Sequence, residues 1–150
     1  MKNKINYLII LIPSIIMSTI TFPNEKHFLT PHLVTSLSIN NFDITVEVAD
    51  NAKQRELGLM FRKSIKPNHG MLFVYKSSKL HCMWMKNTQI PLSVAFIDKS
   101  HKIINIKPME PFNKTPQCSD KPAKFALEMN SGWFKKNGVL PGQKVYGLNN

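Results

Sequence analysis

Apolar residues along the chain fall into short runs that predict β-strands. Between Phe42 and Val48 every second residue is apolar and the others are polar, which is the period of a half-buried strand. Met71–Tyr75 is apolar throughout, so we expect this strand in the centre of a sheet. Further predicted strands are Leu92–Ile97, Ile103–Ile106, Phe125–Met129 and Lys144–Tyr146.

Helical patterns are scarce by comparison. One short helix is predicted over Ala52–Leu57, where Asp50 or Asn51 can cap the N-terminus and Gly58 can end the helix. Trp133–Asn137 has the length of a single helical turn. Many short strands with little helix predict a mainly β fold, a compact antiparallel sandwich or barrel with one short helix; an α+β fold is the alternative.

The first residues have the pattern of a targeting segment. Lys2 and Lys4 precede an apolar stretch, Ile5–Ile20, that Pro13 interrupts. This stretch is shorter than the roughly 20 apolar residues that a membrane-spanning helix needs. We therefore expect residues 1–21 to be a signal peptide.

This pattern also sets the expected organisation and location of the chain. Residues 22–40 read as a polar connector, and residues 41–150 as a single domain. We expect a periplasmic or secreted protein; the alternative is a membrane-anchored one, held by an uncleaved segment over residues 5–20.

The stretch over residues 82–98 reads as strand, turn and strand. If its first part is a strand, Trp84 and Lys86 point to one side and the neighbouring methionines to the other. Lys86 and Asn87 then lie at a strand end beside a large aromatic ring, where polar groups can be held in place.

Charge and composition restrict the partners. The chain of 150 residues has a formal net charge of +11, which favours acidic partners. No cluster of lysine and arginine with interleaved aromatic residues is present, so we do not expect nucleic-acid binding. We expect a monomer without a cofactor, whose partner is a small polar or anionic ligand or an envelope component.

Two cysteines, Cys82 and Cys118, leave two possibilities open. An exported protein can join them in a disulfide, or both can be free thiols. Their spacing does not match a zinc motif. His81 and Cys82 are adjacent and point to opposite faces of a strand, so we expect no metal site there.

Several motifs occur together in a recognisable order. They are GLMFR at 58–62, GMLFVY at 70–75, WMKNTQIPL at 84–92, FID at 96–98, LEMNSG at 127–132 and GVLPGQKV at 138–145. This series resembles the family called domain of unknown function 192. The resemblance implies a small, mostly β domain that is often exported, and it carries over no catalytic residues. Ser93 stands where the family usually has an aspartate, and Cys118 lacks the family's following proline and tyrosine.

Five residues are candidates for a site. Lys86 can hold an anion while Asn87 donates and accepts hydrogen bonds; alternatively both only close a turn. Trp84 is either a stacking platform or part of the core. Glu128, inside an apolar strand, is either an acid or base with a raised pKa, or an outward-facing residue, or an ion-pair partner of Lys86 or Arg62. Arg62 either binds an anion or forms a surface ion pair.

Three functions are compatible with these residues. The first is a non-catalytic envelope module that binds a small polar or anionic ligand, or a protein partner, around Trp84, Lys86, Asn87 and Glu128. The second is a hydrolase of an envelope glycan with Glu128 as acid and base. The third is a structural accessory protein. No nucleophile elbow, zinc-protease motif or phosphate-binding loop is present.

Overall fold

The structure, a computed structural model, describes residues 32–149. Its strands are β1 (Leu33–Ile39), β2 (Phe42–Ala49), β3 (His69–Lys79), β4 (Cys82–Met83), β5 (Leu92–Ile97), β6 (Ile103–Met109), β7 (Gln117–Cys118), β8 (Ala123–Asn130) and β9 (Val145–Tyr146). Its helices are α1 (Ala52–Leu57) and α2 (Trp133–Lys136). The expected signal peptide and the first part of the connector lie outside the described residues.

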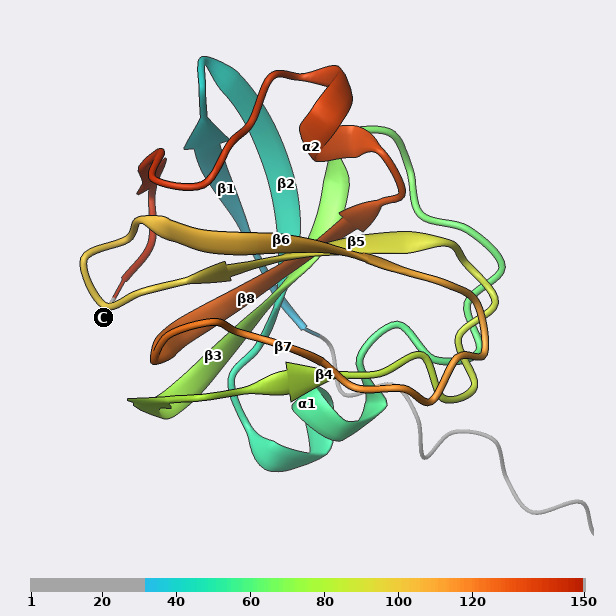
Figure 1. Ribbon diagram of the computed structural model, residues 1–150. Coiled ribbons are helices and arrows are strands. Elements are labelled where there is room, and N and C mark those ends of the chain that lie inside the picture. The colour runs from blue at the N-terminus through green and yellow to red at the C-terminus, as the bar shows by residue number, and fades with distance from the viewer. Residues whose placement is uncertain (1–31, 150) are drawn as a thin grey trace, which may run out of the picture.

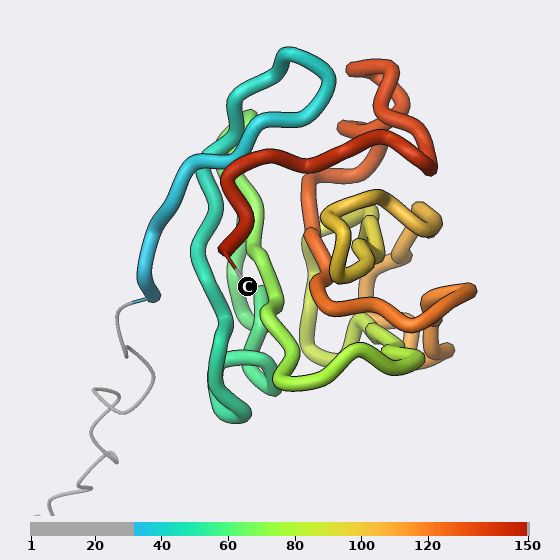
Figure 2. Tube along the Cα trace, turned by 90° about the vertical axis from the view of Figure 1, so that its left-hand side faces the viewer, coloured from blue at the N-terminus to red at the C-terminus, as the bar shows by residue number. Residues whose placement is uncertain are grey.

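Seven strands form one curved sheet in the order β6-β5-β8-β3-β2-β1-β9, and β4 pairs with β7 in a small second sheet. Figure 1 shows β5 and β6 crossing in front of β2 and β3. Figure 2 shows β1 and β2 on one side of the molecule and β5 and β6 on the other. The large sheet therefore coils into a half-barrel, as strongly twisted sheets do. The prediction of a mainly β fold is confirmed.

The large sheet differs from the expected antiparallel one at a single pair of strands. β2 and β3 run parallel, while the other neighbouring strands are antiparallel. The segment between β2 and β3 carries α1 and crosses to the opposite end of the sheet, which a parallel pair requires. The described residues form two short helices, α1 and α2, whereas the predicted fold had one.

β1 shows that the sheet begins before Asn41. The expected connector over residues 22–40 includes Leu33–Ile39, which pairs with β2 along its whole length. Leu37 and Ile39 are buried there. Polar residues occupy most of the other positions of β1, because the strand lies near an edge of the sheet and exposes one face.

The central strands β3, β5 and β8 are covered on both faces over most of their length, which explains their largely apolar sequences. One face packs against α2. The other packs against Leu59, in the loop after α1, and Met85, in the turn after β4. Glu128 points to this second face, because its neighbours in β8, Leu127 and Met129, belong to the first.

α1 has the predicted cap. The Gln54 amide donates to Asn51 Oδ1 at 3.0 Å, and the Gln54 side-chain oxygen accepts from the Asp50 amide at 3.3 Å. The helix ends at Gly58, whose φ is 48° and whose amide donates to the Gln54 carbonyl at 2.8 Å. Among the described residues, no helix is long and apolar enough to cross a membrane.

Candidate functional site

The turn after β4 brings three of the sequence candidates together at the surface. Trp84 is 49% exposed, and Lys86 Nζ lies 5.5 Å from the centroid of its ring, within reach of a cation–π contact. Met85, between them, is 2% exposed and anchors the turn in the core. Trp84 and Lys86 are therefore side by side as predicted, but in the turn after β4 and not along a strand, because β4 ends at Met83. Asn87 has a φ of 53°, a left-handed conformation that asparagine tolerates better than most residues.

Two further loops are held against this turn by backbone hydrogen bonds. The Phe61 amide donates to the Asn87 carbonyl at 2.9 Å, and the Phe112 amide donates to the Thr88 carbonyl at 3.0 Å. Phe61 and Phe112 have φ angles of 64° and 60° and are exposed. Positive φ at non-glycine residues costs on the order of 1–3 kcal/mol each and tends to cluster at binding sites. Three of the seven non-glycine residues with positive φ in residues 32–149 thus lie on this surface.

A cavity of about 340 Å³ opens between α1, the loop after it and the turn after β4. We call it the Lys86 cavity. Its apolar wall includes Leu57, Met60, Phe61 and Trp84. Its polar groups include Lys53, Glu56, Lys86 and Asn87. Two ammonium groups against one carboxylate make this cavity electropositive.

A second cavity, of about 220 Å³, reaches the Glu128 side chain, and we call it the Glu128 cavity. Its wall includes Phe73, Tyr75, Met83 and Arg55. It shares Glu56, Leu57, Met60 and Trp84 with the Lys86 cavity. The two cavities are therefore neighbours with a common wall, and Trp84 contributes to both.

Glu128 is held rigidly in its cavity by the sheet. It lies opposite Met71 of β3 and Val94 of β5, so its backbone is paired on both sides. Glu128 is 4% exposed, and this burial raises the pKa of its carboxyl group to about 8. Burial and the nearby Glu128 charge also raise the pKa of Tyr75, whose hydroxyl donates to Met83 Sδ at 3.2 Å.

The arginines play structural parts in this geometry. Arg62 forms a two-fold ion pair with Glu47, in which Nη2 lies 2.7 Å from Oε2, and it lines neither cavity. This hydrogen bond raises the pKa of Arg62 and lowers that of Glu47. Arg55 lines the Glu128 cavity, but its Nη1 donates to the carbonyls of Asp50 at 2.6 Å and Val74 at 3.0 Å. Of the two alternatives considered for Arg62, the structure shows the surface ion pair.

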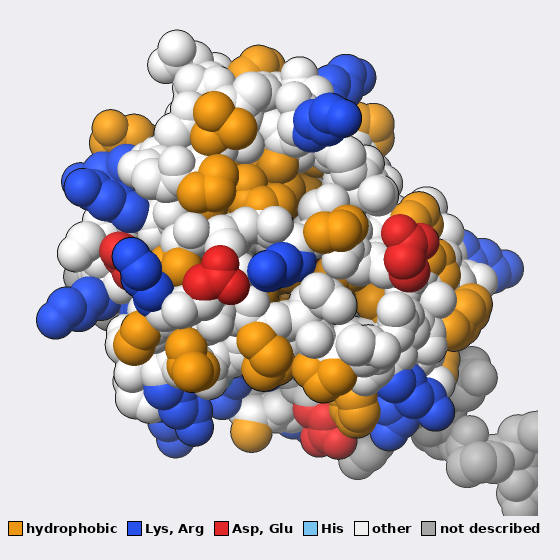
Figure 3. All heavy atoms as spheres, in the orientation of Figure 1, with side chains coloured by type: hydrophobic (Ala, Val, Ile, Leu, Met, Phe, Trp, Pro, Cys, Tyr) orange, Lys and Arg blue, Asp and Glu red, His pale blue; other side chains and the backbone are white. Residues whose placement is uncertain are grey.

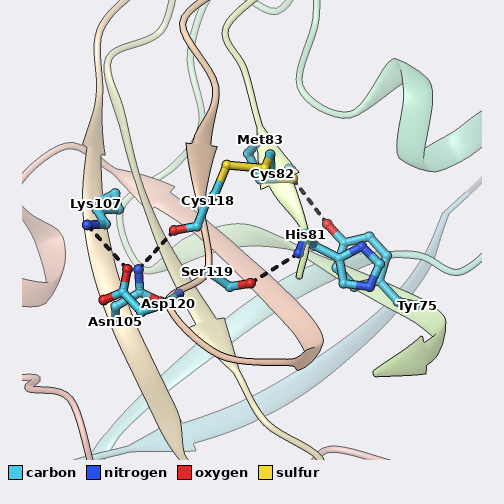
Figure 4. Close-up of a disulfide and its surroundings, with 9 residues drawn as sticks. All are labelled: Tyr75, His81, Cys82, Met83, Asn105, Lys107, Cys118, Ser119 and Asp120. Carbon is cyan, nitrogen blue, oxygen red and sulfur yellow. Dashed lines mark hydrogen bonds and ion pairs between the residues drawn. A yellow bond between two sulfur atoms is a disulfide. The ribbon is translucent and has the colours of Figure 1, made fainter. Parts of the chain in front are cut away.

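A disulfide joins Cys82 of β4 to Cys118 of β7, as Figure 4 shows. The two residues lie directly opposite each other in the small sheet. Cys82 and Met83 line the Glu128 cavity, so the disulfide holds one of its walls. Asn105 of β6 supports the same wall by donating to the Cys118 carbonyl at 3.0 Å.

His81 is part of the packing around this wall. Its ring stacks on that of Tyr75, with the centroids 3.5 Å apart and the planes 8° from parallel (Figure 4). Burial lowers the pKa of His81. In the part of the chain that the structure describes, no three His, Cys, Asp or Glu side chains lie together as a metal site would require.

Ser93 lies away from both cavities, on the face of β5 opposite to that of Val94. It is buried and its Oγ accepts a hydrogen bond from the Gly132 amide at 3.3 Å. Ser93 lies opposite Met129 of β8 and contributes to the packing before α2. The resemblance to the family implied an aspartate at the position of Ser93. The substitution says nothing about the chemistry around Glu128.

The structure therefore separates the sequence candidates into groups. Trp84 lines both cavities, Lys86 and Asn87 line the first, and Glu128 lines the second. Sequence reasoning missed the contribution of α1 and its following loop, namely Lys53, Glu56, Leu57 and Met60. The signal was available in the GLMFR motif directly after a capped helix, but only the fold shows that this segment meets the turn after β4.

Comparison with known proteins places the chain among related structures. A crystal structure of a "putative transcription regulator" from Sinorhizobium meliloti 1021 is 38% identical, with a TM-score of 0.69, and the match covers 73% of this chain and 88% of that one. A protein of unknown function from Novosphingobium aromaticivorans DSM 12444 is 27% identical, with a TM-score of 0.73, and the match covers 79% and 89%.

None of the curated proteins compared with the chain is similar to it. The family DUF192, described as "Uncharacterized ACR, COG1430", matches residues 35–147. This span takes in α1, α2, both cavities and the large sheet apart from the first two residues of β1. The chain thus belongs to the DUF192 family, as its motifs predicted.

Proposed function

We propose that this domain is a non-catalytic module that binds a small polar or anionic ligand in the Lys86 cavity. The observation that carries the proposal is that two lysines, Lys53 and Lys86, line a cavity with an aromatic and aliphatic wall. A concave, largely apolar site with a few convergent polar groups is the usual form of a small-ligand site. An anionic group on an apolar or planar body fits this combination.

Each polar group has a distinct role in such a site. Lys86 is held over Trp84 by the cation–π contact, so its charge is placed before a ligand arrives. The Asn87 side chain donates to Met60 Sδ over 3.9 Å, a weak contact that a ligand oxygen can replace at little cost. Trp84 supplies a half-exposed ring on which a planar ligand can stack.

Binding is better supported than hydrolysis. A glycan hydrolase of the kind considered needs Glu128 as the acid and Lys86 or Asn87 as the polarising group on the same substrate. Glu128 lines one cavity, and Lys86 and Asn87 line the other. A catalytic group must come within hydrogen-bond reach of the atom it protonates, and this division works against that reach.

The description of the Sinorhizobium protein suggests regulation of transcription as a second possibility. On the face shown in Figure 3, lysine and arginine side chains are spread over the surface with acidic residues among them, rather than gathered in one patch. The helices of the described residues have six and four residues, which is short for a helix that reads the major groove. These observations favour a ligand-binding role over direct DNA contact.

We also propose that the domain is exported. Its support is the targeting pattern of the first residues together with the disulfide between Cys82 and Cys118, a bond that persists in oxidising compartments. Fractionation of cells that produce the full chain, with mass measurement of the mature protein, tests this proposal. An uncleaved cytoplasmic protein with two free thiols would rule it out.

Calorimetric titration of the purified protein with benzoate and phenyl phosphate tests the binding site. We expect binding that falls at least tenfold in Lys86→Ala and stays unchanged in Lys99→Ala, since Lys99 is exposed at the hairpin after β5 and lines neither cavity. Equal affinities of Lys86→Ala and the unaltered protein would show that the Lys86 cavity is not the site.

A further inference from the structure

Glu128 is a buried carboxyl group without a partner in the described part of the chain. The ion pairs there join Arg62 to Glu47 and Lys107 to Asp120, and no hydrogen bond to the Glu128 side chain is formed. A buried carboxylate normally has such partners, because removing its charge from water without compensation is costly. The position therefore calls for an explanation.

The carboxyl oxygens of Glu128 open onto the Glu128 cavity. Every side-chain nitrogen or oxygen among residues 32–149 that is fully closed off from solvent has a hydrogen-bond partner. Glu128 has none, and it lines the cavity, so its oxygens face the cavity space. The sheet fixes their position, because the backbone is paired with β3 and β5 on both sides.

The rest of the cavity wall suits a cation. Trp84, Phe73 and Tyr75 line it with aromatic rings, and the face of such a ring attracts positive charge where it is free. The Tyr75 ring is already stacked on His81 and lies under Arg55, so Trp84 and Phe73 are the rings left for a ligand. A second carboxylate, Glu56, lies on the wall shared with the Lys86 cavity. The cation of the wall, Arg55, already donates to two backbone carbonyls and lies over the Tyr75 ring, with Cζ 6.0 Å from its centroid. When Glu128 is ionised, two carboxylates face the single guanidinium of Arg55, so the cavity is then acidic, opposite in sign to its neighbour.

An organic cation fits this site better than a metal ion or a neutral ligand. Metal binding would need further ligating side chains, and no group of three lies together in residues 32–149. A neutral hydroxyl group would form an ordinary hydrogen bond with Glu128, whereas an ammonium group forms a charge-assisted one of about twice the strength. The aromatic and thioether wall then receives the apolar body of the ligand.

We propose that the Glu128 cavity binds the primary ammonium group of a small amine with an aromatic or aliphatic body, with Glu128 as its counter-ion. This site goes beyond the proposed anion site in the Lys86 cavity, and either can exist without the other. Because the wall that contains Trp84 and Met60 is common to the two cavities, the amine and the anion would bind next to each other, each to its own charged group.

The pH dependence follows from the groups around Glu128. An ammonium group binds the ionised carboxylate, and burial raises the pKa of this carboxyl to about 8, so binding at pH 7 displaces a proton. The other charged or titratable groups facing it are Arg55 and Glu56 from α1 and Tyr75 from β3, whose pKa is raised. Cys82 of β4 is in the disulfide and does not titrate. Affinity for the amine therefore rises between pH 7 and 9.

Benzylamine and butylamine, with benzyl alcohol as the neutral counterpart, test the proposal by calorimetric titration of the full chain. We expect both amines to bind at least tenfold more tightly than benzyl alcohol, and about tenfold more tightly at pH 9 than at pH 7, given a carboxyl pKa of about 8. Glu128→Gln, which keeps the shape of the side chain, should lose this preference, while Asp43→Asn, at an exposed position of β2, should keep it. Amines that bind no better than benzyl alcohol to the unaltered protein would overturn the proposal without any variant.

Benzoate and benzylamine separate this site from the anion site. Lys86→Ala should weaken benzoate binding and leave benzylamine binding intact, while Glu128→Gln should remove the preference for benzylamine and leave benzoate binding intact. Unchanged benzoate binding in Lys86→Ala, with benzylamine selectivity kept, would count against the Lys86 cavity and leave the ammonium site standing. Loss of benzylamine selectivity together with intact benzoate binding would do the reverse.

Discussion

The amide of Phe61 donates a hydrogen bond of 2.9 Å to the carbonyl of Asn87, and both residues have left-handed backbone conformations, with φ angles of 64° and 53°. This bond joins the loop after α1 to the turn after β4 at the rim of the Lys86 cavity. Two strained residues thus support each other across the site. The arrangement raises the question whether Asn87 serves the turn alone or also a ligand.

Two substitutions of Asn87 separate these roles. Asn87→Gly keeps the left-handed conformation and removes the side chain, so we expect little change in stability and weaker binding of benzoate. Asn87→Ala disfavours the conformation and should cost about 1 kcal/mol of unfolding free energy. Urea denaturation and calorimetric titration of both variants measure the two effects. Unchanged benzoate binding in Asn87→Gly would assign Asn87 to the turn alone.

The two tryptophans should differ in their contribution to stability. Trp133 is 7% exposed and its Nε1 donates to Asn68 Oδ1 at 2.9 Å, so Trp133→Ala should cost about 3–5 kcal/mol. Trp84 is 49% exposed, so Trp84→Ala should cost far less while abolishing stacking in both cavities. Thermal and urea unfolding compare the two. Equal losses of stability would make Trp84 a core residue.

Glu128 should make the protein less stable as the pH rises. Its pKa is about 8 in the folded protein, against an ordinary value of 4.5, so the folded state holds a proton that the unfolded state releases. Stability is then highest below pH 4.5 as far as this group is concerned, and falls by a few kcal/mol as the pH rises to 8.

The difference between the unaltered protein and Glu128→Gln isolates this effect. Urea denaturation at pH 5, 6.5 and 8 should show the variant gaining relative stability with each step. A constant difference over that range would mean that the carboxyl group has an ordinary pKa. Glu47 has a lowered pKa because Arg62 bonds to it, so its contribution is lost only as the pH falls through the acid range.

Removal of the disulfide should destabilise the small sheet and the Glu128 cavity. Cys82 and Cys118 are separated by 36 positions, for which the chain-entropy relation gives about 4 kcal/mol. The double variant Cys82→Ala/Cys118→Ala and the reduced protein should lose similar amounts in urea denaturation. Reductant should have no further effect on the double variant, which serves as the control. A protein whose thiol count is two before reduction would contradict this structure.

Arg62 provides a variant that should leave binding untouched. Arg62→Lys loses the two-fold contact with Glu47, which is worth on the order of 1 kcal/mol at a partly exposed position. Because Arg62 lines neither cavity, affinity for benzoate and benzylamine should not change. A large loss of affinity would mean that the loop after α1 transmits the change to the cavities.

Local patterns in the sequence were sufficient for most of the fold. The alternation over Phe42–Val48, the apolar run over Met71–Tyr75 and the Asn51 cap all correspond to observed elements. β1 escaped prediction because a strand near the sheet edge needs few buried residues, and its polar positions resemble a linker. The parallel pairing of β2 and β3 depends on a crossover, which leaves no periodic trace in the sequence.

By itself, the sequence determined the fold class, the family and the chemical types of the candidate residues, since these depend on local periodicity and short motifs. Only the tertiary structure decided which candidates share a cavity. The turn that carries Lys86 lines one cavity together with α1, and the neighbouring cavity is lined by Glu128. Both cavities are formed by segments that are far apart in the chain. The burial of Glu128, and hence its raised pKa, arises from packing on both sides of β8, which no local pattern records.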